Sequence, residues 1–93
     1  GEADVISAFS SDGRIAAQDL VVLTDPKGAI PAYDALLLVS PARAKDGSLD
    51  AALRPLVGSI GVEAMRRANL LVDRESDKLS PEAAARTLLP RAR

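Results

Sequence analysis

The chain has 93 residues, a formal net charge of -1, and neither histidine nor cysteine. This length allows one small domain, or part of a larger one, with a modest core. Without cysteine or histidine, the chain lacks thiol nucleophiles, thiolate metal ligands and the usual general base. We therefore expect no catalytic residue, no metal site and no cofactor. The near-zero charge also argues against a nucleic-acid partner, and no stretch approaches the ~18 consecutive apolar residues of a membrane span.

Apolar residues make up 47% of the chain, which excludes a disordered polypeptide. The aromatic residues are only Phe9 and Tyr33, so alanine and leucine carry the core. The chain begins at Gly1 with neither a methionine nor a signal peptide. We expect it to be a piece of a longer protein.

The sequence of the first half of the chain predicts β-strands. Residues 5–9 and 20–23 are short apolar runs of strand length, and turn-forming residues follow each of them. Residues 35–39 are apolar on both faces, as in a strand buried in a parallel sheet, although a helix is the alternative. Residues 14–18 predict a single helical turn.

Two shorter patterns join these runs. The order Asp25-Pro26-Lys27-Gly28 predicts a β-turn with proline in its second position. Residues 29–34 should be extended, because a residue that precedes proline avoids the helical region.

The second half predicts three helices. Ser48 is the expected N-cap of the first, and Pro55 should kink or loosen it. The second helix should cover residues 62–72, after a break that contains two glycines. Ser80, Pro81 and Glu82 mark the start of the third, which should run to residue 89 before Pro90. We interpret the first two as a packing unit, because the second helix offers only one arginine pair to DNA.

Several segments of the sequence, in order, resemble one known family. These are residues 1–6, 9–16, 20–28, 30–35, 65–69, 72–73 and 80–85. They are similar to the substrate-binding domains of osmoprotectant ABC transporters of the glycine betaine, choline and carnitine type.

The resemblance implies an α/β fold. The chain would be the C-terminal portion of a bilobal periplasmic-binding-protein (type II, Venus-flytrap) fold, with short strands followed by three C-terminal helices. Residues 1–28 would end the second lobe, residues 29–34 would form the hinge crossing, and residues 35–93 would complete the first lobe.

The resemblance also implies a binding site. A quaternary ammonium group has no N–H to donate, so the faces of aromatic rings hold it through cation–π attraction. Tyr33 matches one tyrosine of the family's aromatic cage, and Phe9 stands where another tyrosine is usual. Ser10 and Ser11 would offer hydroxyl groups to the ligand. We expect Asp12 to cap the following turn instead of touching the ligand.

The partners implied are a small quaternary ammonium or zwitterionic ligand, the remainder of the binding domain, and an ABC permease. The location would be periplasmic or extracytoplasmic, and the run at residues 36–38 is similar to receptors tethered to the membrane through a fused permease. Because its strands would lack neighbours, the isolated chain should dimerise or exchange strands. The alternatives are the effector-binding lobe of a transcriptional regulator and a small helical interaction domain.

Overall fold

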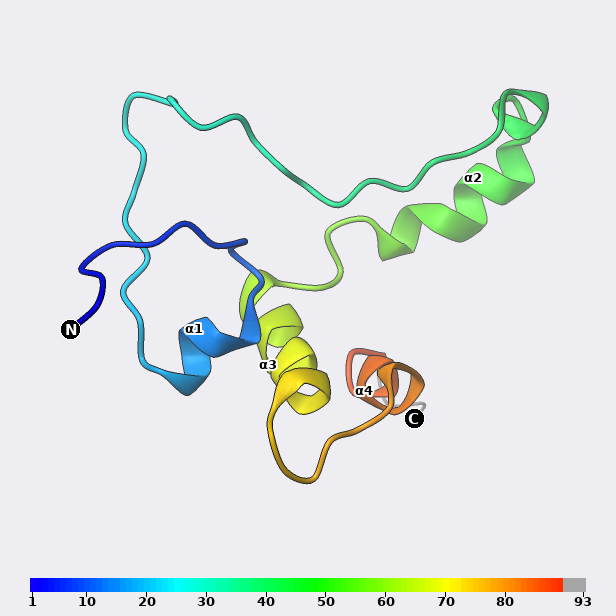
Figure 1. Cartoon of the computed structure of the whole chain (residues 1–93). Coiled ribbons are helices and arrows are strands. Elements are labelled where there is room, and N and C mark those ends of the chain that lie inside the picture. Colours follow the sequence, from blue (N-terminus) through cyan, green and yellow to red (C-terminus); the bar gives the residue numbers. More distant parts are fainter. Residues whose placement is uncertain (90–93) are drawn as a thin grey trace. The chain divides into compact units, whose positions relative to one another are not determined.

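The structure is a computed structural model that describes residues 1–89 of the chain (Figure 1). Its elements in order are α1 (Gly13–Ala17), the 3-10 turn η1 (Pro41–Arg43), α2 (Gly47–Leu53), the 3-10 turn η2 (Arg54–Leu56), α3 (Val62–Asp73) and α4 (Pro81–Arg86). The chain divides into two units. The first joins Gly1–Val22 to the segment that begins at Gly61, and the second is Leu23–Ile60.

Helix α1 is short and is fixed at both ends. The Asp12 carboxylate accepts a hydrogen bond from the backbone N–H of Arg14 at 2.9 Å, which caps the first turn. At the other end, Asp19 takes a left-handed conformation (φ 51°), and the N–H of Leu20 reaches back to the carbonyl of Ile15 at 2.9 Å. The helical turn expected over residues 14–18 is thus confirmed.

Helix α3 is the centre of the first unit, because it packs against both α1 and α4. The apolar side chains that are buried in the described residues are Ile15 of α1, Ala68 of α3 and Ala84 of α4. The approach of α1 to α3 depends on Gly13, since a Cβ atom there would lie only 2.5 Å from the backbone nitrogen of Leu70. The predicted helix over 62–72 is confirmed.

Helix α4 begins as its sequence predicts. The Ser80 hydroxyl accepts a hydrogen bond from the N–H of Ala83 at 3.2 Å, and Pro81 occupies the first turn. The helix ends at Arg86, before the predicted end at residue 89. The predicted stop at Pro90 lies outside the described residues.

Helix α2 belongs to the second unit and starts earlier than expected. Asp46, not Ser48, is the N-cap, and its carboxylate accepts from the N–H of Leu49 at 3.0 Å. The helix ends at Leu53, where the chain tightens into η2 around Pro55. This agrees with the loosening expected there, because proline lacks the N–H that an α-helix would use.

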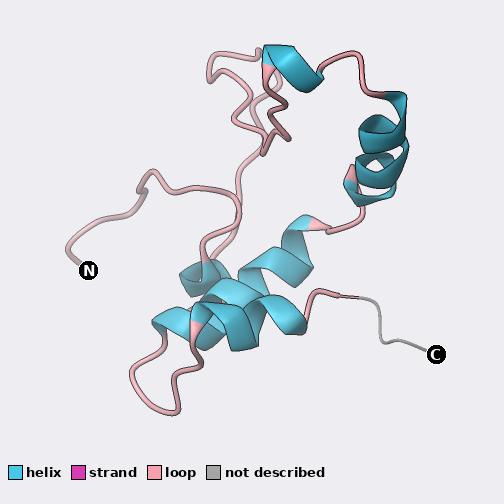
Figure 2. Ribbon diagram, turned by 90° about the vertical axis from the view of Figure 1, so that its right-hand side faces the viewer, coloured by secondary structure: helices cyan, strands magenta, loops and turns pink. Residues whose placement is uncertain are grey.

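The predicted strands are wrong: no strand occurs in residues 1–89 (Figure 2). Residues 5–9, 20–23 and 35–39 are irregular, so the α/β class with short strands does not describe this part of the chain. The physical reason is that a strand exists only when another strand satisfies its backbone N–H and C=O groups. Strand-like composition alone does not provide that partner, and the predicted strand exchange loses its basis.

The predicted β-turn in the second unit is confirmed. The N–H of Gly28 donates to the carbonyl of Asp25 at 3.1 Å, and Gly28 has a positive φ of 60°. The Asp25 carboxylate also accepts from the N–H of Ile30 at 2.8 Å. Donation from Ile30, and then from Ala29, lowers the pKa of Asp25.

Large apolar side chains are exposed in both units. They are Val5, Ile6, Phe9, Leu20, Val21, Val22, Leu23, Ile30, Tyr33, Leu36, Leu37, Leu38, Val39, Leu56, Val57, Ile60, Val62 and Leu89. Within residues 1–89, none of the helices has both the length and the apolar character needed to span a bilayer.

Candidate ligand-binding site

Three of the four predicted ligand residues lie together in the loop that precedes α1. Phe9, Ser10 and Ser11 are consecutive, and the N–H of Asp12 donates to the carbonyl of Phe9 at 3.0 Å to close a tight turn. The Phe9 side chain is 65% exposed. Ser10 is exposed and Ser11 is half-buried. The two serines have hydroxyl groups that can donate to or accept from a polar ligand.

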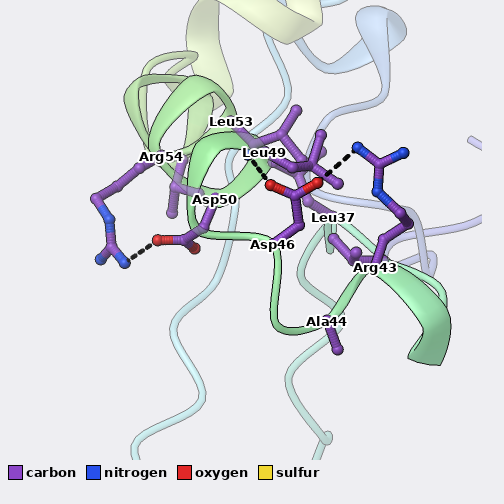
Figure 3. Close-up of a pocket in the computed structure, with 10 residues that line it drawn as sticks. Leu37, Arg43, Ala44, Asp46, Leu49, Asp50, Leu53 and Arg54 are labelled. Atoms are coloured by element: carbon purple, nitrogen blue, oxygen red, sulfur yellow. Dashed lines mark hydrogen bonds and ion pairs between the residues drawn. The ribbon is translucent and has the colours of Figure 1, made fainter.

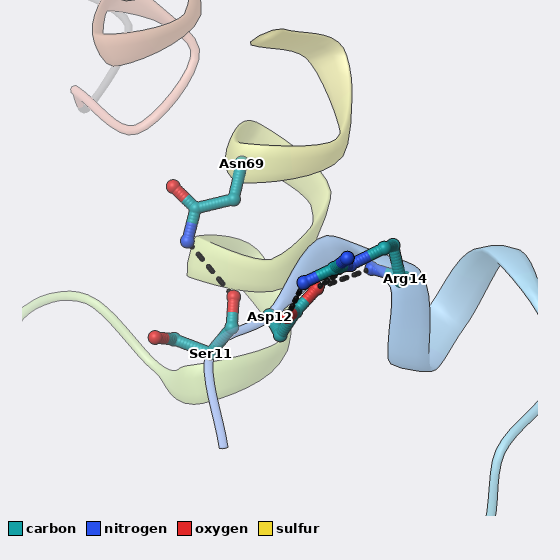
Figure 4. A network of polar contacts seen from close by, with 4 residues as sticks. All are labelled: Ser11, Asp12, Arg14 and Asn69. Atoms are coloured by element: carbon teal, nitrogen blue, oxygen red, sulfur yellow. Dashed lines mark hydrogen bonds and ion pairs between the residues drawn. The ribbon is translucent and has the colours of Figure 1, made fainter. Parts of the chain in front are cut away.

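Helix α3 binds this loop through two side chains. The Asn69 amide nitrogen donates to the carbonyl of Ser11 at 2.8 Å (Figure 4), and the Arg66 guanidinium Nε donates to the carbonyl of Ser10. Sequence reasoning missed both contacts. The donors and acceptors are 56 and 58 residues apart in the chain, so no local pattern signals them.

The end of the loop is charged. The Arg14 guanidinium forms an ion pair with the Asp12 carboxylate at 2.7 Å, as Figure 4 shows. Hydrogen bonds from the Arg14 side chain, and then from its backbone N–H, lower the pKa of Asp12 to about 2. Asp12 is therefore an ionised cap at neutral pH, which confirms the capping role expected of it.

A hollow of about 280 Å³ opens on the first unit beside the start of α1. Its walls combine apolar and polar side chains, namely Ile6, Ser7, Ala8, Asp12, Arg14, Ile15, Gln18 and Leu20. Phe9, Ser10 and Ser11 are not among them. The hollow therefore adjoins the predicted site without being formed by its residues.

Tyr33, the fourth predicted residue, belongs to the second unit. It lies in the irregular segment that follows Pro31, and its side chain is 85% exposed. Phe9 and Tyr33 are thus in different units, and their assignment to one site stays a prediction.

A second hollow, of about 250 Å³, lies within the second unit (Figure 3). Aliphatic side chains form much of its wall, including Leu37, Leu49 and Leu53. The sequence predicted Leu49 and Leu53 on one helix face but did not predict the hollow itself.

Two ion pairs border this second hollow. Arg43 contacts Asp46 at 2.7 Å, and Arg54 binds Asp50 one helical turn away. Each carboxylate is therefore already neutralised by an arginine. No aromatic ring lines this hollow, so its chemistry does not match a cage for a methylated cation.

A metal site in this chain would need several carboxylate side chains close together, because histidine and cysteine are absent from the sequence. Within residues 1–89, no group of three or more aspartate or glutamate side chains is arranged to hold a metal ion.

The comparison with known families defines the class of this protein. Residues 1–90 match a family of substrate-binding domains of ABC-type transport systems. The particular family is described as the substrate binding domain of the ABC-type glycine betaine transport system, and the chain belongs to it. No solved structure matches the chain.

Membership fixes the general role. The family binds a small-molecule ligand outside the cytoplasm for an ABC permease, and it is a family of binding proteins, not of enzymes. The chain therefore has a substrate-binding role in glycine betaine transport.

Proposed function

We propose that Phe9 and Tyr33 are ligand-binding residues, each offering an aromatic face to the trimethylammonium group of glycine betaine. Ser10 and Ser11 offer hydroxyl groups to its carboxylate. The observation that carries the proposal is the exposure of the chain's two aromatic side chains, 65% for Phe9 and 85% for Tyr33. A ring face must be accessible before a cation can lie against it.

The chemistry favours a cation without N–H groups. Each aromatic face contributes about 0.5–2 kcal/mol to such binding, depending on how completely the cation is desolvated. Phenylalanine at position 9 supplies a ring face without a hydroxyl group. Choline, carnitine and related zwitterions share the trimethylammonium group, so they belong to the same ligand class.

Calorimetric titration of the full-length protein tests this proposal. We expect Phe9→Ala and Tyr33→Ala each to weaken glycine betaine binding about 2- to 30-fold. Tyr33→Phe should stay near the wild-type affinity because the ring remains. Leu36→Ala, which removes an exposed aliphatic side chain of the second unit, is the matched control and should change nothing.

A second ligand tests whether binding depends on the positive charge of the quaternary nitrogen. Tert-butylacetate has the shape of glycine betaine but carries carbon in place of the quaternary nitrogen, so it should bind much more weakly. Equal binding of the two ligands, or wild-type affinity in both alanine variants of the rings, would contradict the proposal.

We also propose how the chain is divided in the receptor. In this division residues 1–28 and 35–93 belong to different lobes, residues 29–34 cross between them, and the packing of α1 on α3 is a contact between the lobes. Pro31 restricts the backbone of this crossing, and the hydrogen bond from Ile30 to Asp25 anchors its start. Distances between spin labels on the two parts, measured with and without glycine betaine, should change if the crossing is a hinge.

Delivery of the ligand to the permease completes the proposal. In membrane vesicles that contain the permease, glycine betaine uptake should require the full-length protein and should fall in the Tyr33→Ala variant. The proposed attachment of the receptor to a fused permease rests on the run at residues 36–38. It predicts that the full-length protein stays with the membrane after a high-salt wash.

The exposed apolar side chains of both units favour association. We propose that the 93-residue chain on its own forms dimers through these side chains.

A further inference from the structure

Side chains of helix α3 hold the loop at residues 9–12. Arg66 and Asn69 lie three positions apart on α3, so they share one face of the helix. Arg66 donates to the carbonyl of Ser10, and Asn69 donates to the carbonyl of Ser11 at 2.8 Å. Two consecutive peptide groups of the loop are therefore fixed by side chains of one helix.

The same loop is fixed at its far end by α1. The backbone N–H of Asp12 donates to the carbonyl of Phe9, and the Asp12 carboxylate caps α1. Gly13 brings the start of α1 against the backbone of Leu70. Leu70 directly follows Asn69 on α3. The contact between the two helices and the two side-chain hydrogen bonds thus act on one short stretch of backbone.

We propose that Arg66 and Asn69 are positioning residues for glycine betaine binding. They hold the backbone of Ser10 and Ser11, and through it the Phe9 ring, in the conformation that receives the ligand. This inference rests on the proposed function, because it assigns Phe9, Ser10 and Ser11 to the ligand site. A loop that is ordered before binding loses less conformational entropy when the ligand arrives, so the affinity is higher.

Two substitutions in the full-length protein remove the donors. Asn69→Asp keeps the shape of the side chain but replaces the N–H₂ donor with an oxygen that repels the Ser11 carbonyl. Arg66→Ala removes the contact with Ser10. We expect each to weaken glycine betaine binding about tenfold and to speed amide hydrogen exchange in the peptide that covers residues 9–15.

Two controls separate positioning from general stability. Arg67→Ala removes a neighbouring arginine of α3 that makes no hydrogen bond to the loop, and it should leave both measurements unchanged. Ser80→Ala removes the cap of α4 and lowers stability without touching the loop, so it should keep wild-type affinity. Arg66→Lys retains a charged N–H donor and should restore part of the affinity lost in Arg66→Ala.

The outcomes distinguish this inference from the proposed function. Wild-type affinity or unchanged exchange in both Asn69→Asp and Arg66→Ala overturns the positioning role, even when Tyr33→Ala weakens binding as expected. Equal loss of affinity in Ser80→Ala also overturns it. If the wild-type protein does not distinguish glycine betaine from tert-butylacetate, the proposed function fails, and the positioning role fails with it.

Discussion

At the scale of single residues, Asp12 stabilises the start of α1 in three ways. Its carboxylate caps α1 and pairs with Arg14, and its backbone N–H donates to the carbonyl of Phe9 to close the preceding loop. Because its pKa is about 2 in the folded chain and about 3.9 in an unfolded one, the folded state favours the ionised form. Its stabilising contribution is therefore present above pH ~4 and is lost as the pH falls toward ~2.

This linkage predicts the behaviour of Asp12→Asn, which retains a capping side chain but loses the negative charge. At neutral pH the variant should melt at a lower temperature than the wild type. The difference should shrink between pH ~4 and pH ~2, where the wild-type carboxylate becomes protonated. Thermal melts followed by circular dichroism over this range check it.

Asp4→Asn provides the control for this prediction. Asp4 is exposed and forms no hydrogen bond or ion pair with the described residues, so its replacement should leave the pH dependence unchanged. A constant difference between Asp12→Asn and the wild type across the whole range would contradict the role assigned to the charge.

The residue scale also shows what local sequence reveals. Asp12 was predicted to cap α1, and it does, because a cap bonds to an N–H only two or three residues away. Ser48 was predicted to cap α2, but the structure uses Asp46, a residue type that caps helices equally well. The hydrogen bond from Asn69 to Ser11 could not be predicted from local sequence, because the two residues are 58 positions apart. Local partners are therefore predictable, whereas distant ones depend on how the helices pack.

At the scale of elements, the close approach of α1 and α3 makes a sharp prediction for Gly13→Ala. Alanine is the better helix former, by about 1 kcal/mol. Its Cβ atom, however, would lie 2.5 Å from the backbone nitrogen of Leu70, so the helices must move apart. We expect a net destabilisation of about 1–3 kcal/mol, measured by denaturant unfolding.

The chain contains a matched control for this substitution. Gly47 is also the first residue of a helix and also follows an aspartate cap, but no atom lies within 4 Å of its added Cβ. Gly47→Ala should therefore be neutral or slightly stabilising. Equal effects of the two substitutions would show that the approach to Leu70 does not limit the packing of α1 on α3.

The elements differ in how well the sequence predicts them, and the reason is physical. Helices satisfy their hydrogen bonds within one segment, so local signals are enough to locate them. The signal is an aspartate cap for α1, a break with two glycines before α3, and a serine cap with proline at the start of α4. A strand needs a partner from elsewhere, which composition does not supply. The runs at 5–9, 20–23 and 35–39 are therefore apolar as predicted but irregular in residues 1–89.

At the scale of the whole molecule, few apolar side chains of the described residues are buried and many are exposed. The buried apolar residues in the described part of the chain are Ile15, Ala68 and Ala84, two of which are small. Many larger aliphatic side chains are exposed, and Leu38 is 89% exposed. Removing apolar surface from water yields about 25 cal/mol per Å², so contact between such surfaces is favourable. This supports the proposed dimer.

The proposed dimer predicts a concentration-dependent mass for the 93-residue chain. Sedimentation equilibrium from low to high micromolar concentrations should show monomers giving way to dimers. Leu38→Asp should shift this equilibrium toward the monomer, because it places a charge in the associating surface without removing a buried side chain. Ala32→Asp, an equal change of charge in the same unit at a small side chain, is the matched control and should have a weaker effect. A monomer at every concentration would show that the exposed apolar side chains do not drive self-association.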